Sequence, residues 1–366
     1  MPSPTTLSRL PGTPYTITHS NFTSKDHATM TVSCNLADPA TNPVIAGHII
    51  NNIQLVPSCL YGDMAAAVAR YIWAQLRPDE NKDIGVNVCN MHVDKTFIPK
   101  IQDAGVREEW FEMEAHADLI PSSSKADGGS MGSIDCTFRK LNDPTFSSDF
   151  AGCTVQFEPL STWSKSWEAN ASLITTQIQN LIARSAVESS GHIRTFQRGW
   201  AYERFKTFVD YHEKYQNMKE VVIDYEQLEA TALLSYQCSP STDYCGPFFL
   251  DGSCHLSGWV CNESEADSKK NAYISHGWGG MKLLPEFSVA EVNKGEGVFR
   301  TYVRMQKRGK DVLGGDVFIL KGDEIVGCCE GVEFKRIPRR VLNHFLPPRK
   351  CTSANQNILF DLRIDC

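Results

Sequence analysis

Residues 57 to 78 read PSCLYGDMAAAVARYIWAQLRP, and this pattern predicts a central helix. Apolar side chains recur at helical spacing from Leu60 to Ile72. Pro57 suits a first helical position, and Pro78 closes the run. The alanines around Ala66 make this helix slim and apolar on nearly every side. Such a helix needs to be enclosed by other structure, and a curved sheet is the natural enclosure.

A second helix of the same kind is predicted by residues 245 to 262, which read CGPFFLDGSCHLSGWVCN. Strand-like patterns precede and follow each helix. Further helical segments are predicted at 161–190 and 202–211. The strands expected around the first helix are 26–36, 84–98, 107–120, 132–140 and 150–158. Those expected around the second are 220–234, 271–284, 298–307, 312–320 and 324–336, the last two joined by a tight turn.

The two halves share the order of their elements, although they do not share residue identity. Strand, central helix and a run of antiparallel strands, repeated twice, predict an α+β protein with a double hotdog fold. The expected units are an N-terminal hotdog at 10–160, a helical connector at 161–195, a C-terminal hotdog at 196–348 and a tail at 349–366.

Composition narrows the class of protein. A chain of 366 residues, 42% apolar and 22% charged, suits two domains of a globular protein. Its net charge of −7, with scattered basic residues, argues against a nucleic-acid partner. The N-terminus does not resemble a signal peptide, and no apolar window approaches the ~18 residues of a membrane span. We therefore expect a cytoplasmic protein without a membrane partner.

Thirteen cysteines occur at irregular spacings, without a C-x-x-C pair or a His/Cys cluster at the spacing of metal ligands. We therefore expect most of them to be buried, reduced thiols that pack as small apolar side chains. No metal site is predicted.

His48 and Asp251 are the predicted catalytic residues. His48 and Pro57 fit the H-x8-P frame of dehydratase-type active sites. Asp251 and His255 form a D-x-x-x-H pair, one helical turn apart on one face. A histidine with an ordinary pKa of about 6.5 is mostly neutral at physiological pH and can accept a proton. We expect Asp251 in the first turn of its helix, where the helix dipole favours the carboxylate. The pair suits proton abstraction beside a carbonyl, followed by loss of water.

Structural roles are the alternatives for each of these residues. A histidine is more often structural than catalytic, and an acid near a helix start is often a cap. His255 would either tune Asp251 or satisfy a buried hydrogen bond. The matching positions of His48 and Asp251 in two similar halves favour a shared site. His255, Asn52, Ser58 and His276 are the further candidates for substrate binding or proton relay.

The chain resembles the product-template domains of fungal non-reducing polyketide synthases over roughly residues 10 to 348. The similar segments include Gly47-His48 through Pro57-Ser58, Leu60 through Ala65, Val209-Asp210-Tyr211, Leu228-Glu229-Ala230, Asp251, His255 through Gly258, Ser275 through Trp278, Tyr302 through Met305, Gly315-Asp316-Val317 and Ile337-Pro338-Arg339. The chain departs from the family at Asn52 and Asn217, where glycine is usual, at Gly62, where alanine is usual, and at Gly252-Ser253, where bulkier or more polar residues are usual.

The resemblance implies a polyketide cyclase and dehydratase. It would take a poly-β-keto chain from the phosphopantetheine of an acyl carrier protein and direct aldol cyclisation and dehydration to an aromatic product. It further implies His48 as base, Asp251 as its partner, and no cofactor or metal of its own. A β-hydroxyacyl thioester dehydratase and a non-catalytic polyketide-binding double hotdog are the alternatives. Whether the chain is an excised domain or a free-standing relative, and whether it forms a homodimer, are left open.

Overall fold

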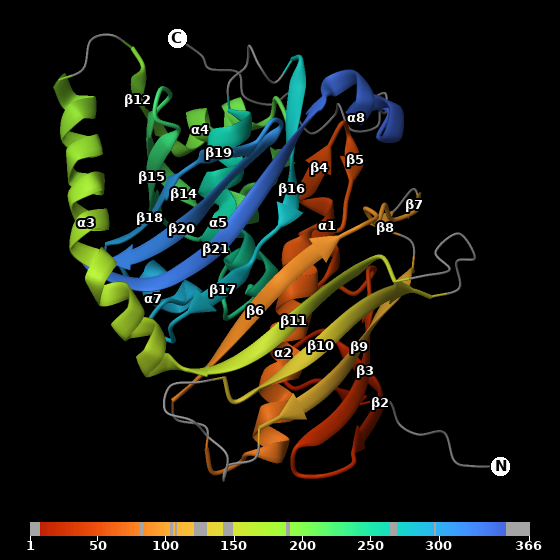
Figure 1. Cartoon of the computed structure of the whole chain (residues 1–366). Helices are drawn as coiled ribbons and strands as arrows, with labels where there is room; N and C mark the ends of the chain where they lie inside the picture. Colours follow the sequence, from red (N-terminus) through yellow and green to blue (C-terminus); the bar gives the residue numbers. More distant parts are fainter. Residues whose placement is uncertain are drawn as a thin grey trace.

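The computed structural model describes residues 8–348 except 81–82, 103–104, 107, 121–129, 142–148, 188–190, 264–268 and 296–297. The predicted tail, 349–366, lies outside these residues. Two large antiparallel sheets form most of the described structure, and each curves around one central helix, α2 (Ser58–Leu76) in the first unit and α5 (Gly246–Asn262) in the second (Figure 1). This is the predicted double hotdog.

The first sheet wraps α2 with strands whose side chains alternate between the core and the opposite face. Tyr61 of α2 is fully buried against the rings of Phe111, Phe138 and Phe150. The hydrogen-bonded order is β1 (Ser8–Arg9), β2 (Thr16–Phe22), β3 (His27–Asn35), β9 (Trp110–Leu119), β10 (Gly132–Lys140), β11 (Ala151–Pro159) and β6 (Ile84–Val93). The short α1 (Asn42–Ala46) precedes α2, and β7 (Ile101–Gln102) pairs with β8 (Gly105–Val106).

The second sheet wraps α5 in the same manner. Its order is β12 (Ile193–Gln197), β14 (Met218–Asp224), β15 (Glu229–Leu234), β18 (Phe299–Arg304), β20 (Val312–Lys321), β21 (Glu324–Pro338) and β16 (Asn271–Gly277). Beside this path, β17 (Gly280–Leu283) pairs with β21, and β19 (Gln306–Gly309) pairs with β20. Also present are α4 (Arg198–Phe205), η2 (Glu213–Tyr215), α7 (Val289–Lys294) and α8 (Arg339–Phe345).

The long helix α3 (Leu160–Val187) connects the units and lies along the outer face of the second sheet (Figure 1). Trp163 and Trp167 bury their rings against Tyr302 and Leu320 of that sheet. Burial of these large aromatic rings stabilises the packing of the helix on the sheet.

The two sheets join at one edge. Met91 of β6 and Trp278 exchange backbone hydrogen bonds of 3.1 and 3.3 Å. Gly277 has a φ of +108°, and a Cβ there would lie 1.7 Å from the carbonyl oxygen of Met91. Only glycine permits this approach. The edge contact and the packing of α2 on α5 bring the two units together.

Several sequence predictions differ from the structure in detail. The strand expected at 220–234 is the hairpin of β14 and β15, because Asp224 Oδ1 accepts the backbone N–H groups of residues 226 and 227 and closes a turn. The helix expected at 202–211 ends at Phe205, before β13 (Asp210–Tyr211). Strand β12 begins inside the expected connector, 161–195. Pro57 is the N-cap of α2 instead of its first residue.

The cysteines are as the sequence predicts. The eleven in the described part of the chain are free thiols, and nearly all are buried. None of the described helices is long and apolar enough to cross a membrane.

Candidate active site

A cavity of about 220 Å³ lies where the two units meet, and it has His48 and Asp251 in its wall. Ser58 and His255 also line it. His48 comes from the first unit, while Asp251 and His255 come from α5 of the second. We call this space the His48 cavity.

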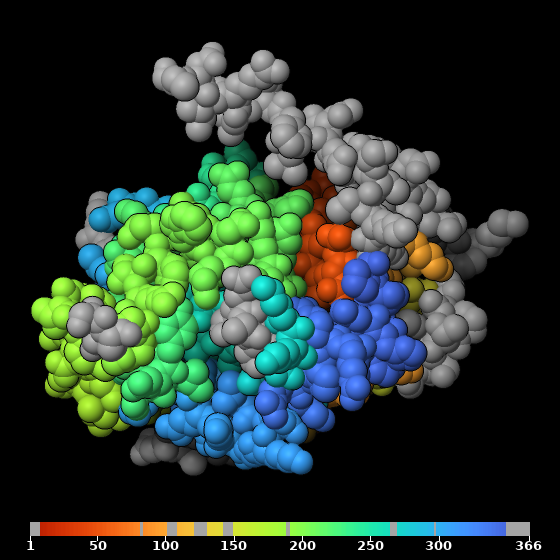
Figure 2. All heavy atoms as spheres, turned by 90° about the horizontal axis from the view of Figure 1, so that it is seen from above, coloured from red at the N-terminus to blue at the C-terminus, as the bar shows by residue number. Residues whose placement is uncertain are grey.

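His48 begins the short strand β4 (His48–Ile50), which pairs with β5 (Ile53–Gln54) on one side and with β13 on the other. Because β13 belongs to the second half of the chain, this ladder fixes His48 relative to α5. Gly47 allows the close packing, since a Cβ there would lie 3.1 Å from the ring of Tyr215. The turn between β4 and β5 is held from outside by α8, where Asn51 Nδ2 donates to Asn343 and to the carbonyl of Leu346. Figure 2 shows α8 beside this segment.

His255 holds Asp251. Its Nδ1 lies 2.7 Å from Asp251 Oδ2, and its side chain is only 1% exposed. A carboxylate only accepts hydrogen bonds, so Nδ1 of His255 is the donor in this bond. No described group bonds to the buried Nε2 of His255. Asp251 is 15% exposed, so its carboxylate is fixed by His255 while it stays accessible from the cavity.

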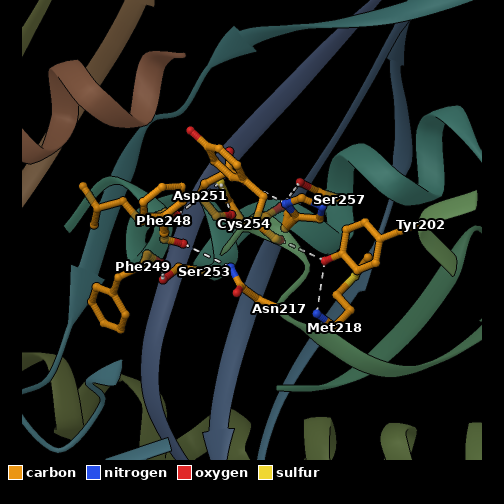
Figure 3. Close-up of polar contacts among 12 residues, drawn as sticks. Tyr202, Asn217, Met218, Phe248, Phe249, Asp251, Ser253, Cys254 and Ser257 are labelled. Atoms are coloured by element: carbon orange, nitrogen blue, oxygen red, sulfur yellow. Dashed lines mark hydrogen bonds and ion pairs between the residues drawn. The ribbon is translucent and has the colours of Figure 1, made fainter. Parts of the chain in front are cut away.

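Aromatic rings connect the two sides of the cavity. The ring of Tyr211 lies 5.3 Å from that of His48 and 4.5 Å from that of His255. Behind it, the hydroxyl of Tyr202 donates to the carbonyl of Tyr215 and accepts the backbone N–H of Met218, the latter drawn in Figure 3. The imidazoles are therefore held at fixed orientations by packing.

Burial sets the electrostatics of the site. Loss of solvent lowers the pKa of His48 below its ordinary value of 6.5, the charge of Asp251 opposes that shift, and His255 adds to it. The Nδ1 atom of His48 is buried and has no hydrogen-bond partner among the described residues. Burial also raises the pKa of Tyr211 well above its ordinary value of 10.0. At neutral pH the cavity thus has a neutral imidazole at His48 and a neutral phenol at Tyr211.

The structure brings four of the six predicted site residues together, namely His48, Ser58, Asp251 and His255. Asn52 and His276 do not line the cavity. His276 is exposed on β16, although its neighbours Ser275 and Gly277 face the cavity. Asn52 is exposed in the turn between β4 and β5 at a φ of +60°. That left-handed conformation explains why glycine suits this position and why asparagine is tolerated.

Asp251 lies in the second turn of α5, which begins at Gly246, and not in the predicted first turn. The helix dipole acts mainly on the first turn, so it is not the main influence on this carboxylate. The hydrogen bond from His255 takes its place.

Sequence reasoning missed most of the cavity wall. Tyr211, Phe205, Cys254 and Trp278 line it, and each is brought there by a different element. Tyr211 and Trp278 occur in segments that resemble the product-template domains. Nothing in their spacing showed that they would meet.

Fold and site together define a double hotdog protein with a histidine and an aspartate from opposite units in one cavity. The chain is similar to a segment of fungal non-reducing polyketide synthases. It is 40% identical over 329 residues to non-reducing polyketide synthase PKS1 of Zymoseptoria tritici, and 38% identical over 331 residues to non-reducing polyketide synthase 1 of Elsinoe fawcettii. The matches cover 89% and 88% of this chain but 14% of each synthase, so the chain spans a small part of their length. No protein-family model matches the chain.

Solved structures show the same fold. The dehydratase domain from the CurF module of curacin polyketide synthase superposes with a TM-score of 0.57 at 12% identity, over 90% of this chain and all of that domain. The dehydratase domain of PpsC from Mycobacterium tuberculosis gives 0.56 at 11% identity, over 88% of this chain and 97% of that one. At such low identity this likeness concerns the fold.

Proposed function

We propose that this protein is a polyketide cyclase and dehydratase of the product-template type. The observation that carries the proposal is the position of His48 and Asp251, which face one cavity from opposite units. Similarity to segments of fungal non-reducing polyketide synthases supports a poly-β-keto chain as substrate, carried on the phosphopantetheine of an acyl carrier protein.

His48 is the proposed base. A methylene between two ketones is unusually acidic because its anion is delocalised, so a neutral imidazole can remove its proton. The enolate carbon then attacks a ketone carbon further along the chain and forms the carbon–carbon bond. The new alkoxide takes the proton from His48 and becomes a hydroxyl. Loss of a ring proton and of this hydroxyl, as water, gives the aromatic ring.

Asp251 and Tyr211 support these steps. The carboxylate of Asp251, held by His255, stabilises the imidazolium that forms on His48. In the dehydration it can relay the proton that His48 removes from the ring to the leaving hydroxyl, which departs as water. Tyr211 keeps its phenolic proton and can donate a hydrogen bond to an enolate oxygen. These steps move protons and form one carbon–carbon bond, so they require no redox cofactor.

Reconstitution tests the proposal. The protein is added to a minimal non-reducing polyketide synthase that lacks its own cyclase, and the products are identified by mass spectrometry. We expect one aromatic product in place of the mixed pyrones that form spontaneously. The same products with and without the protein would refute it. Turnover of a short 3-hydroxyacyl thioester without ring formation would identify a simple dehydratase instead.

A further inference from the structure

A second cavity, of about 600 Å³, is lined by Asp63 of α2 and Gly246 of α5, and we call it the Asp63 cavity. Asp63 is the sixth residue of α2, and Asp251 is the sixth residue of α5. Other residues of α2 and α5 correspond in the same way when they are separated by the same number of positions as Asp63 and Asp251. The residues that line the second cavity and their counterparts in the His48 cavity are Asp63 and Asp251, Ala66 and Cys254, and Arg70 and Gly258.

Residues on the strands around the two helices show the same correspondence between the cavities. Val86 of β6 lines the second cavity, and Ile274 of β16 lines the His48 cavity at the same interval. Gly246 and Ser58 correspond in the same way as the first residues of their helices. The second cavity is therefore the counterpart of the His48 cavity under the internal repeat of the fold.

The second cavity has no counterpart of the base. Tyr236 precedes α5 by the same interval at which His48 precedes α2. Its ring packs on those of Phe249 and Phe287, and its hydroxyl donates to the carbonyl of Phe249. A phenol held in this way cannot replace a neutral imidazole as proton acceptor. The second cavity therefore lacks the proton acceptor that His48 supplies in the first.

The carboxyl group of Asp63 is held in place by neighbouring side chains. The hydroxyls of Tyr15 and Tyr244 both donate to its Oδ2, each at 2.5 Å. A Cβ at Gly246 would lie 2.0 Å from its Oδ1, so glycine is needed where α5 passes. Both tyrosines bond to Oδ2, so neither of them uses Oδ1.

The charged and aromatic side chains of the second cavity indicate which kind of ligand it can bind. Arg70 lines the same cavity and is exposed, and its charge acts on Asp63, although no salt bridge within 4 Å includes it among the described residues. The walls are apolar and partly aromatic, with Trp73, Phe249 and Phe287. An unpaired guanidinium favours an anionic group, and aromatic walls favour a flat apolar body.

We propose that the Asp63 cavity is a second ligand site, which binds an anionic aromatic molecule with a hydroxyl oxygen and does not convert it. The anionic group pairs with Arg70, the rings lie against Trp73 and Phe249, and the hydroxyl oxygen bonds to Asp63 Oδ1. This proposal does not depend on the reaction assigned to the His48 cavity.

Equilibrium binding of 6-hydroxy-2-naphthoate, a fluorescent molecule whose hydroxyl and carboxylate lie at opposite ends of its rings, tests the site. Arg70→Gln changes an exposed side chain and is expected to weaken binding about tenfold. Ala66→Phe fills the cavity and is expected to abolish binding there. Cys254→Phe, at the corresponding position of α5, fills the His48 cavity instead and is expected to leave binding at the Asp63 cavity intact. Thermal unfolding checks that each variant is folded.

The outcomes separate this proposal from the proposed function. Ala66→Phe is expected to keep ring-closing activity while it loses the ligand, and Cys254→Phe is expected to do the reverse. Wild-type protein that does not bind the probe, or Arg70→Gln that binds it as tightly as wild type, would overturn the second site. If Ala66→Phe is unfolded, binding of the probe is compared between Cys254→Phe and the double variant Cys254→Phe/Arg70→Gln. Weaker binding by the double variant would support the second site, and equal binding would overturn it.

Discussion

The Nδ1 atom of His255 lies 2.7 Å from Oδ2 of Asp251, one helical turn earlier on α5. Replacing His255 by alanine removes a charge-assisted hydrogen bond, worth about 1.5–3 kcal/mol, and frees the carboxylate to rotate. We therefore expect kcat to fall roughly tenfold to a hundredfold, since 1.4 kcal/mol is a factor of ten.

The matched control is His255→Gln, whose amide can still donate to Asp251. It is expected to keep most of the activity lost in His255→Ala, with little change in KM for either variant. Equal losses in both variants would mean that His255 does more than position Asp251.

The lowered pKa of His48 predicts how activity depends on pH and in which direction substitutions shift that pKa. Burial lowers its pKa, so the neutral base persists below pH 6.5, and the acidic limb of kcat/KM is expected below that pH. Asp251 raises the pKa of His48, and His255 lowers it. Asp251→Asn is therefore expected to move the pKa further down, and His255→Gln to move it up.

Nuclear magnetic resonance titration of the His48 ring in wild type and in both variants measures these shifts directly. A His48 pKa above 6.5 in the wild type would contradict the buried environment described for this ring.

Gly246 gives a test of stability. In Gly246→Ala the new methyl group would meet Asp63 Oδ1 at 2.0 Å and break the contacts with Tyr15 and Tyr244. Loss of buried hydrogen bonds together with strain is expected to lower the free energy of unfolding by about 2–4 kcal/mol. Urea denaturation measures the change.

The control for that variant is Gly199→Ala in α4, where a Cβ meets nothing within 4 Å. Alanine favours a helix over glycine by up to about 1 kcal/mol, so a small gain is expected. A similar loss in both variants would show that the clash at Asp63 is not the cause.

Two departures from the product-template pattern are in contact. A Cβ at Gly252 would lie 2.7 Å from Nδ2 of Asn217, which bonds to the carbonyl of Phe248 (Figure 3). Gly252→Ala is expected to cost about 1–3 kcal/mol of stability. Adding Asn217→Gly should recover part of that loss, and a double-mutant cycle by urea denaturation measures the coupling. Strictly additive losses would show that the two departures are independent.

The fold could be predicted because its pattern is local. Two slim, apolar helices, each followed by alternating strands, indicate a central helix wrapped by a sheet without any long-range information. The 220–234 hairpin was missed because its turn depends on the side chain of Asp224, within an otherwise continuous apolar run.

The site was predictable only in part. His48, Asp251 and His255 could be found from their positions before and along the two helices. Tyr211 reaches the cavity because β13 pairs with β4, a contact between distant segments that periodicity does not reveal. The turn of α5 that carries Asp251 depended on where the helix begins, and helix boundaries are the least certain part of such a prediction.

The central claim is that His48 and Asp251 act together in ring closure. The most direct measurement is the product distribution from a minimal polyketide synthase supplemented with wild type, His48→Ala or Asp251→Asn protein, each confirmed to be folded. We expect the aromatic product with wild type and a return to spontaneous pyrones with either variant. The wild-type product distribution from folded His48→Ala protein would contradict the account.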